Sequence, residues 1–317
     1  MKFINNWMFG RNGKNGRFMD HMPVSVNKLY SGMGAVRDRL NDYRDLKQEF
    51  YAKMNYELDL DYPRSFNQKI QWKKVNDRNP LLTVTTDKYE VRSYIKEVLG
   101  EKQGNKILIP LYHVTSKPED IPFDQLPGKF VMKPNHGSQM HLMVRNKDEV
   151  TREQLINESN KWLKKNFGFY THEWAYRNIK RKIIFEKLLE TRQGKLPKDY
   201  KLYCFHGKCE IIRIVKNRFD REVFAGYFDT AWNLLNVEVP PFKANHYFEK
   251  PDNLKEMIRL AEQLSKPFDF VRVDLFNLNP ELYFGELTHY EFSGFGRFEP
   301  ESFDYLLGSY WHINSSG

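Results

Sequence analysis

The stretch from Phe270 to His289, FVRVDLFNLNPELYFGELTH, constrains the fold of this 317-residue chain more than any other. Its flanks are rich in β-branched and aromatic residues, and turn-forming residues lie between them at 277–280. This composition predicts two antiparallel strands joined by a tight turn. If the turn is centred near residue 280, Asp274 lies opposite Glu286 on the neighbouring strand.

The two faces of this predicted hairpin differ in chemistry because side chains alternate along a strand. The polar face carries Arg272, Asp274, Glu286 and Thr288, with Arg272 opposite Thr288. The apolar face, expected in the core, carries Val271, Val273, Leu275, Gly285 and Leu287. Two carboxylates opposite each other repel. A divalent cation between them removes the repulsion, and hard oxygen ligands suit Mg²⁺. The alternative is a half-exposed hairpin whose charges face solvent.

Charge and composition limit the class of partner. The formal net charge of +9 indicates an acidic partner such as nucleic acid, anionic lipid, nucleotide or acidic glycan. Zinc-finger spacing and RNP-type aromatic motifs are absent, so we do not expect nucleic acid. A hydrophobic content of 40% is typical of a folded globular protein. The two cysteines, Cys204 and Cys209, provide no disulfide framework.

The sequence favours a cytoplasmic protein. No apolar run approaches the ~20 residues that a membrane span needs. The first residues are basic but lack the apolar core of a secretory signal. Peripheral contact with the inner face of the plasma membrane is one interpretation of this arm, and a packed or disordered arm is the other. The residues that would make such contact are Lys2, Phe3, Trp7, Met8, Phe9 and Arg11.

Periodicity, capping residues and turn formers predict the remaining elements. Helices are expected at about 34–56, from Ser65 with a capping box to Gln68, from about Thr86 to Gly100 with Asp87 in the first turn, and at 151–167, 254–264 and 303–311. Strands are expected at 106–112 and 183–189, and paired strands at 129–144 and 200–215. Proline and glycine at 115–128 predict a boundary between lobes near Gly128.

Two further motifs suit a nucleotide. In KPNHGSQ, residues 133–139, a lysine at a strand end precedes a small polar loop whose backbone N–H groups can surround a phosphate. The loop lacks the spacing of a Walker A motif, and an ordinary hairpin loop is the alternative. In EKLL, residues 186–189, the edge of an apolar strand can recognise a flat base through its backbone. A plain core strand is the alternative there.

Two lysines complete the pattern. Lys201 interrupts an apolar strand in the triplet DYK, and Lys88 follows Asp87 at a helix start. Each alone is equally consistent with a solvated lysine. Together, the order DK, K-x₃-G, EKLL, DYK, R-x-D and E-x-T resembles the ATP-grasp superfamily, and most closely the TupA-like ATP-grasp proteins of bacterial surface-polysaccharide and teichuronopeptide loci. The phrases that carry the resemblance lie within about 62–294: RSFNQKIQWKK, TDKYEVRSYI, FVMKPNHGS, IIFEKLL, DYKLYCFHGK and FVRVDLF…YFGELTHYEFSG.

The resemblance implies an α+β, ATP-grasp fold in which two lobes clasp ATP and Mg²⁺. It implies a phosphate end formed by Lys88, Lys133, Lys201 and the loop Asn135, His136, Gly137, Ser138 and Gln139. It implies an adenine end formed by Glu186 and by the backbone of Lys187, Leu188 and Leu189, with Glu190 or Gln193 at the ribose. It implies Mg²⁺ ligands at Asp274 and Glu286, an oxyanion contact at Arg272, and a third metal ligand at Thr288, where many relatives carry asparagine.

The resemblance also implies a division of the chain and a reaction. Residues 1–60 form an irregular and helical arm, and 61–128 a reduced, mostly helical region in place of a full Rossmann-like domain. Residues 129–185 form the small lobe, and 186–317 the large lobe. The implied reaction joins an amino acid or amine to a carboxylate of a surface polysaccharide or its lipid-linked precursor, through an acyl phosphate. The alternatives are a kinase acting on a glycan hydroxyl, a glycosyltransferase, and a non-catalytic basic module that binds glycan or nucleic acid.

Overall fold

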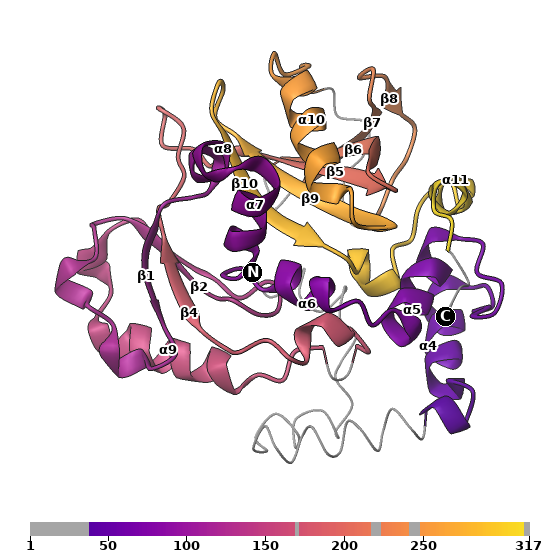
Figure 1. The fold of residues 1–317 in the computed structure, drawn as a ribbon, viewed down its shortest axis with the longest axis horizontal. Coiled ribbons are helices and arrows are strands. Elements are labelled where there is room, and N and C mark those ends of the chain that lie inside the picture. Colours follow the sequence, from indigo (N-terminus) through magenta and orange to yellow (C-terminus); the bar gives the residue numbers. More distant parts are fainter. Residues whose placement is uncertain (1–37, 169–170, 217–222, 241–247, 314–317) are drawn as a thin grey trace.

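A computed structural model describes residues 38–168, 171–216, 223–240 and 248–313 (Figure 1). The predicted membrane-contacting residues at 2–11 lie outside this part of the chain. Among the described helices, none combines the length and apolar character needed to cross a bilayer.

The smaller of two antiparallel sheets has the strand order β1-β4-β2-β3. Its strands are β1 (Leu111–Thr115), β4 (Ile183–Glu186), β2 (Phe130–Pro134) and β3 (Leu142–Val144). Helix α9 (Arg152–Lys164) begins at the predicted capping box of Thr151 and lies beside this sheet (Figure 1). It packs Leu155 and Trp162 into the core of the sheet. Strand β1 precedes the boundary expected near Gly128 and belongs to the same sheet as β2.

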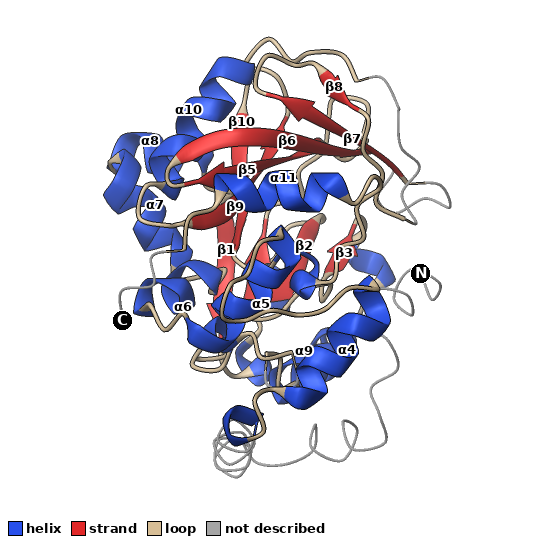
Figure 2. Cartoon of the chain, turned by 90° about the vertical axis from the view of Figure 1, so that its right-hand side faces the viewer, coloured by secondary structure: helices blue, strands red, loops and turns tan. Residues whose placement is uncertain are grey.

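The larger sheet has the order β10-β9-β5-β6-β7-β8, again antiparallel (Figure 2). Its strands are β5 (Lys198–Phe205), β6 (Lys208–Lys216), β7 (Phe224–Asp229), β8 (Leu234–Leu235), β9 (Phe270–Asn277) and β10 (Leu282–Thr288). The predicted hairpin at 200–215 is the β5–β6 pair, with its turn at His206 and Gly207. The amphipathic helix α10 (Leu254–Ser265) buries Met257, Leu260 and Leu264 in the main core.

The register of the β9–β10 hairpin confirms the sequence prediction, with Asp274 opposite Glu286 and Arg272 opposite Thr288. One expected feature is wrong: Gly285 is not a core residue. It sits at a register shift between Phe284 and Glu286. A bulge of this kind lets Phe284 pair with Leu275 in the core while Glu286 faces the cleft described below.

The helices before the small sheet differ from their predicted bounds. They are α4 (Arg44–Met54), α5 (Phe66–Asn76), α6 (Pro80–Thr86), α7 (Val91–Leu99) and α8 (Glu101–Ile107), and α11 (Ser302–Tyr310) follows β10. The Ser65 capping box is confirmed, and Gly100 ends α7 at φ 79°. The helix expected at 34–56 is interrupted by a turn before α4, where Asp42 and Tyr43 have positive φ.

Two other predicted bounds are wrong for identifiable reasons. Asp87 does not lie in the first turn of a helix; it ends α6, and its carboxylate accepts the N–H groups of Tyr89 and Glu90. Asn79 and Pro80 start that additional helix, as an N-cap and a proline in the first turn do. The strand expected at 106–112 begins only at Leu111, because α8 extends to Ile107.

Candidate functional site

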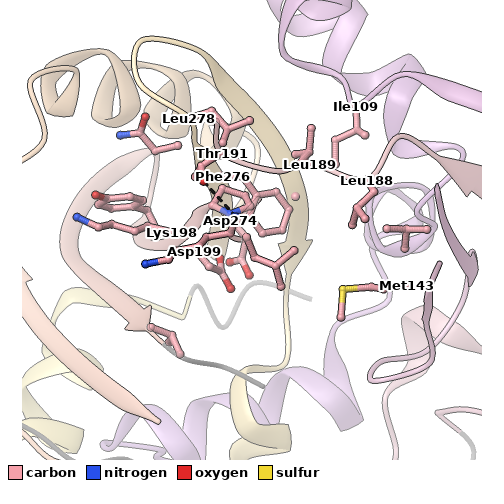
Figure 3. Close-up of a pocket in the computed structure, with 18 of the residues that line it drawn as sticks. Ile109, Met143, Leu188, Leu189, Thr191, Lys198, Asp199, Asp274, Phe276 and Leu278 are labelled. Atoms are coloured by element: carbon pink, nitrogen blue, oxygen red, sulfur yellow. Dashed lines mark hydrogen bonds between the residues drawn. The ribbon is translucent and has the colours of Figure 1, made fainter. Parts of the chain in front are cut away.

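A cleft of about 1200 Å³ lies between the two sheets. Figure 3 shows Ile109, Met143, Leu188 and Leu189 on the small-sheet side, and Phe276 and Leu278 on the large-sheet side. This end of the cleft is therefore an apolar slot between two walls, which suits a flat ring. The predicted residues 186–189 all line it, starting with Glu186, the last residue of β4.

The apolar walls were missed from sequence, although a signal existed. Val131 lies two residues before Lys133 on β2, and Phe276 lies two residues after Asp274 on β9. Alternation along a strand puts each on the same face as its charged neighbour. Both line the cleft. The strand period applied to the predicted site residues would have found them.

Glu186 is held by cations at the junction between the apolar slot and the charged end. Its carboxylate lies 2.6 Å from Lys133 Nζ and 3.6 Å from Arg92 Nη1. The N–H of Lys187 donates to the carbonyl of Pro110, at 2.9 Å. The backbone N–H of Lys187 is therefore already used within the protein.

Lys88 connects the predicted phosphate loop to the carboxylates of the large sheet. Its Nζ donates to the carbonyl of Gly137 at 2.7 Å and lies 3.7 Å from Glu286 Oε2. Burial lowers the pKa of Lys88, while Glu286 opposes that shift. Gly137 has φ 75°, and a Cβ there would lie 2.9 Å from the Phe167 ring, so the close turn requires glycine.

Only part of the predicted phosphate loop faces the cleft. Gly137, Ser138 and Gln139 line it, whereas Asn135 and His136 are buried behind it. The Asn135 amide donates to the Asp87 carboxylate at 2.8 Å, and its oxygen accepts the N–H of Lys182. Asn135 therefore fixes the base of the loop. Burial lowers the pKa of His136 to about 3, so this ring is neutral.

Asp274 is the centre of the charged end. Arg272 donates to both of its oxygens, from Nε and Nη2, each at 2.6 Å. Lys201 Nζ lies 2.5 Å from Asp274 and 2.8 Å from Asp199. Burial alone would disfavour the charged guanidinium, but the Asp274 carboxylate outweighs it and raises the pKa of Arg272.

Arg272 also reaches the opposite strand, where Nη2 donates to Glu286 Oε1 at 3.2 Å. The repulsion expected between the two carboxylates is thus relieved by an arginine in this structure. Thr288 donates its hydroxyl to the same Glu286 oxygen at 3.1 Å. Beyond the hairpin, Arg272 Nη1 donates to the buried Glu291, a contact that sequence reasoning missed.

A sequence model of one protein family, TupA-like ATPgrasp, matches residues 68–312. The chain belongs to the TupA-like ATP-grasp family. The match begins within α5 and extends past the end of α11, so both sheets and the cleft lie within it. The expected α+β, ATP-grasp fold is thereby confirmed.

The solved structures similar to this chain include two D-alanine–D-alanine ligases. The Bacillus anthracis enzyme is 20% identical, with a TM-score of 0.38, over 65% of this chain and 57% of that one. The Helicobacter pylori enzyme is 15% identical, with a TM-score of 0.38, over 72% and 62%. N5-carboxyaminoimidazole ribonucleotide synthetase from Thermus thermophilus is 12% identical, with a TM-score of 0.38, over 65% and 45%.

This chain thus spans less than two-thirds of each of those three proteins. At these TM-scores the likeness carries no argument on substrate or mechanism. No curated protein sequence matches the chain significantly.

ATP-grasp proteins bind ATP and Mg²⁺, and the residues of this TupA-like protein fit both. The apolar slot suits adenine, and Lys88 and Lys133 line the cleft beside the loop at 137–139. Asp274 and Glu286, which line the same cleft, carry hard carboxylate oxygens of the kind that Mg²⁺ binds together with nucleotide phosphates. Within the described ranges, no group of three or more His, Cys, Asp or Glu side chains could hold a metal. Two carboxylates are what a phosphate-bound Mg²⁺ needs.

The two ribose candidates are placed differently. Gln193 lines the cleft. Glu190 pairs with Lys129 at 2.8 Å and with Arg145, so its carboxylate is already held on the small-lobe side.

Proposed function

We propose that this protein is an ATP-dependent ligase that joins an amino acid or amine to a carboxylate of a bacterial surface polysaccharide or its lipid-linked precursor, at the cytoplasmic face of the membrane. One observation supports the chemistry most directly. The same cleft has an apolar slot at one end and, at the other, Lys88, Lys133 and the carboxylates of Asp274 and Glu286. Lys201 and Arg272 are buried behind this end, where both pair with Asp274. That arrangement suits transfer of a phosphoryl group from ATP.

The residues of the cleft would divide the work. The backbone at 186–189 would orient adenine. Lys88, Lys133 and Lys201 would neutralise the phosphates, and Asp274 and Glu286, with Thr288 beside them, would hold Mg²⁺. The metal would offset charge on the transferring phosphoryl group. The acceptor carboxylate would attack the γ-phosphorus, releasing ADP and leaving an acyl phosphate. The amine would then displace inorganic phosphate.

Arg272 suits the second half of this reaction. A guanidinium beside the metal carboxylates can donate to the negative charge that develops on the acyl oxygen. The net charge of +9 favours an acidic acceptor, and a uronic-acid glycan combines that charge with the required carboxylate.

Isotope transfer tests the reaction class. The acceptor oligosaccharide carries ¹⁸O in its carboxylate and is incubated with ATP, Mg²⁺ and an amine. We expect ADP and phosphate only when glycan and amine are both present, with one ¹⁸O in the released phosphate. Unlabelled phosphate alongside amide product would exclude the acyl-phosphate route. A phosphorylated glycan would identify a kinase instead, and transfer of a sugar from a nucleotide sugar would identify a glycosyltransferase.

A further inference from the structure

Glu291 is a buried carboxylate beyond the end of β10, outside the cleft-lining residues and without a part in the reaction above. Its side chain is 1% exposed. It accepts a hydrogen bond from Tyr203 Oη at 2.9 Å, lies 3.3 Å from Arg213 Nη1 and accepts from Arg272 Nη1. These three donors lie on adjacent strands of the large sheet, β5, β6 and β9.

Arg272 is therefore shared between two sets of carboxylates. Nε and Nη2 face Asp274 and Glu286, and Nη1 faces Glu291. Asp274 and Glu286 are the groups assigned to Mg²⁺, so the guanidinium occupies oxygens that the metal needs. The guanidinium is rigid and planar. A charge-assisted hydrogen bond at its far edge therefore limits how closely its near edge can approach the Asp274 and Glu286 oxygens.

We propose that Glu291 is a positioning residue that anchors the far edge of Arg272 and so sets how strongly Arg272 competes with Mg²⁺ for Asp274 and Glu286. This inference rests on the proposed metal role of those two carboxylates. Arg213 and Tyr203 also donate to the Glu291 carboxylate and thereby weaken its hold on Arg272. Without the negative charge of Glu291, Arg272 pairs more tightly with Asp274, and Mg²⁺ binds more weakly.

The test is the affinity of the protein for Mg²⁺ in the presence of the non-hydrolysable nucleotide AMP-PNP, measured by calorimetry. In Glu291→Gln, we expect Mg²⁺ affinity to fall about tenfold, the weakening that the loss of one charge-assisted hydrogen bond corresponds to. AMP-PNP affinity without Mg²⁺ should not change, because the apolar slot and Lys133 do not contact Glu291. Asp304→Asn is the matched control. Asp304 is equally buried, but it accepts from Tyr56 and Asn67, away from Arg272.

A double-mutant cycle separates positioning from a simple loss of nearby charge. In an Arg272→Gln background, Glu291→Gln should no longer change Mg²⁺ affinity. If the tenfold loss persists there, Glu291 acts directly on the metal and the proposal fails. It fails equally if Glu291→Gln binds Mg²⁺ like the wild type.

Arg213→Gln should change Mg²⁺ affinity in the opposite direction. Without Arg213, Glu291 holds Arg272 more strongly, so Mg²⁺ should bind more tightly than in the wild type. If Glu291→Gln does not fold, this variant decides, and unchanged or weaker Mg²⁺ binding would overturn the proposal. A wild-type protein whose AMP-PNP complex takes up no Mg²⁺ would instead overturn the metal site itself, together with this inference.

Discussion

Lys133 both forms a structural ion pair and lines the cleft. Its Nζ forms an ion pair with Glu186 at 2.6 Å while its side chain lines the cleft. Arg92 lies 3.6 Å from the same carboxylate. Glu186 therefore keeps a cationic partner if Lys133 is removed, so binding and folding are separable at this residue.

We predict that Lys133→Ala weakens ATP affinity by about tenfold, because one point charge on the phosphates is lost. The melting temperature should fall little. Lys161→Ala is the control, since Lys161 is an exposed lysine on α9 that pairs with Glu158 of the same helix. Calorimetric ATP binding and thermal unfolding, measured on both variants, check this. Equal affinities for the two variants would contradict the assignment of the phosphate loop.

Buried histidines give the stability of the protein a pH dependence. Burial lowers the pKa of His136 and His289 to about 3 and that of His172 to about 4. The folded state keeps these rings neutral while the unfolded chain, with a pKa near 6.5, takes up protons. Stability is therefore fully present above about pH 6.5 and is lost as the pH falls toward 3.

We predict that the free energy of unfolding falls by about 1.6 kcal/mol per such histidine between pH 6.5 and pH 5. His289→Gln should flatten this slope by one histidine's share, since glutamine does not titrate but can still pair with Thr85, which lies 2.8 Å from His289 Nε2. Urea unfolding at a series of pH values measures the slope. Identical slopes for wild type and variant would contradict the prediction.

At the scale of an element, the β9–β10 hairpin places two carboxylates in unequal surroundings. The Asp274 side chain is 4% exposed and lies between Arg272 and Lys201. The Glu286 side chain is 35% exposed at the rim of the cleft. The bulge at Gly285 makes this geometry possible. Glycine suits the bulge, because a Cβ there would lie 3.1 Å from the carbonyl oxygen of Asp274.

We predict different costs for the two neutralising substitutions. Asp274→Asn should destabilise the fold by about 3 kcal/mol, because it leaves two buried cations short of a partner. Glu286→Gln should cost at most about 1 kcal/mol, as for a surface ion pair. Each should lower Mg²⁺-dependent ATP turnover by orders of magnitude. Denaturant unfolding and turnover assays check both claims. Full activity in both variants, or equal stability losses, would contradict this account.

At the scale of the whole molecule, the cleft exists because two separately packed sheets face each other. The small sheet has its own core around Phe130, Leu155 and Phe185, and the large sheet has another. The cleft is therefore lined from both sides, by residues as far apart in the chain as Lys88 and Phe276.

The sequence by itself determined what depends on local rules. Strand alternation and turn chemistry predicted the hairpin register that joins Asp274 to Glu286, and capping boxes located the starts of α5 and α9. The resemblance of the ordered motifs to those of ATP-grasp proteins implied the fold, which the family match confirms. The register and the helix starts follow from spacing along the chain, which a linear pattern records.

Only the tertiary structure decided which side chains face the cleft and which partners they meet. It buried Asn135 and His136 in the interior, and it brought Glu291 into hydrogen-bond contact with Arg272. It also set Phe276 opposite Leu188 across the slot (Figure 3). These contacts join residues far apart in sequence. They are selected by the burial of both cores and by the pairing of buried charges, which no local period encodes.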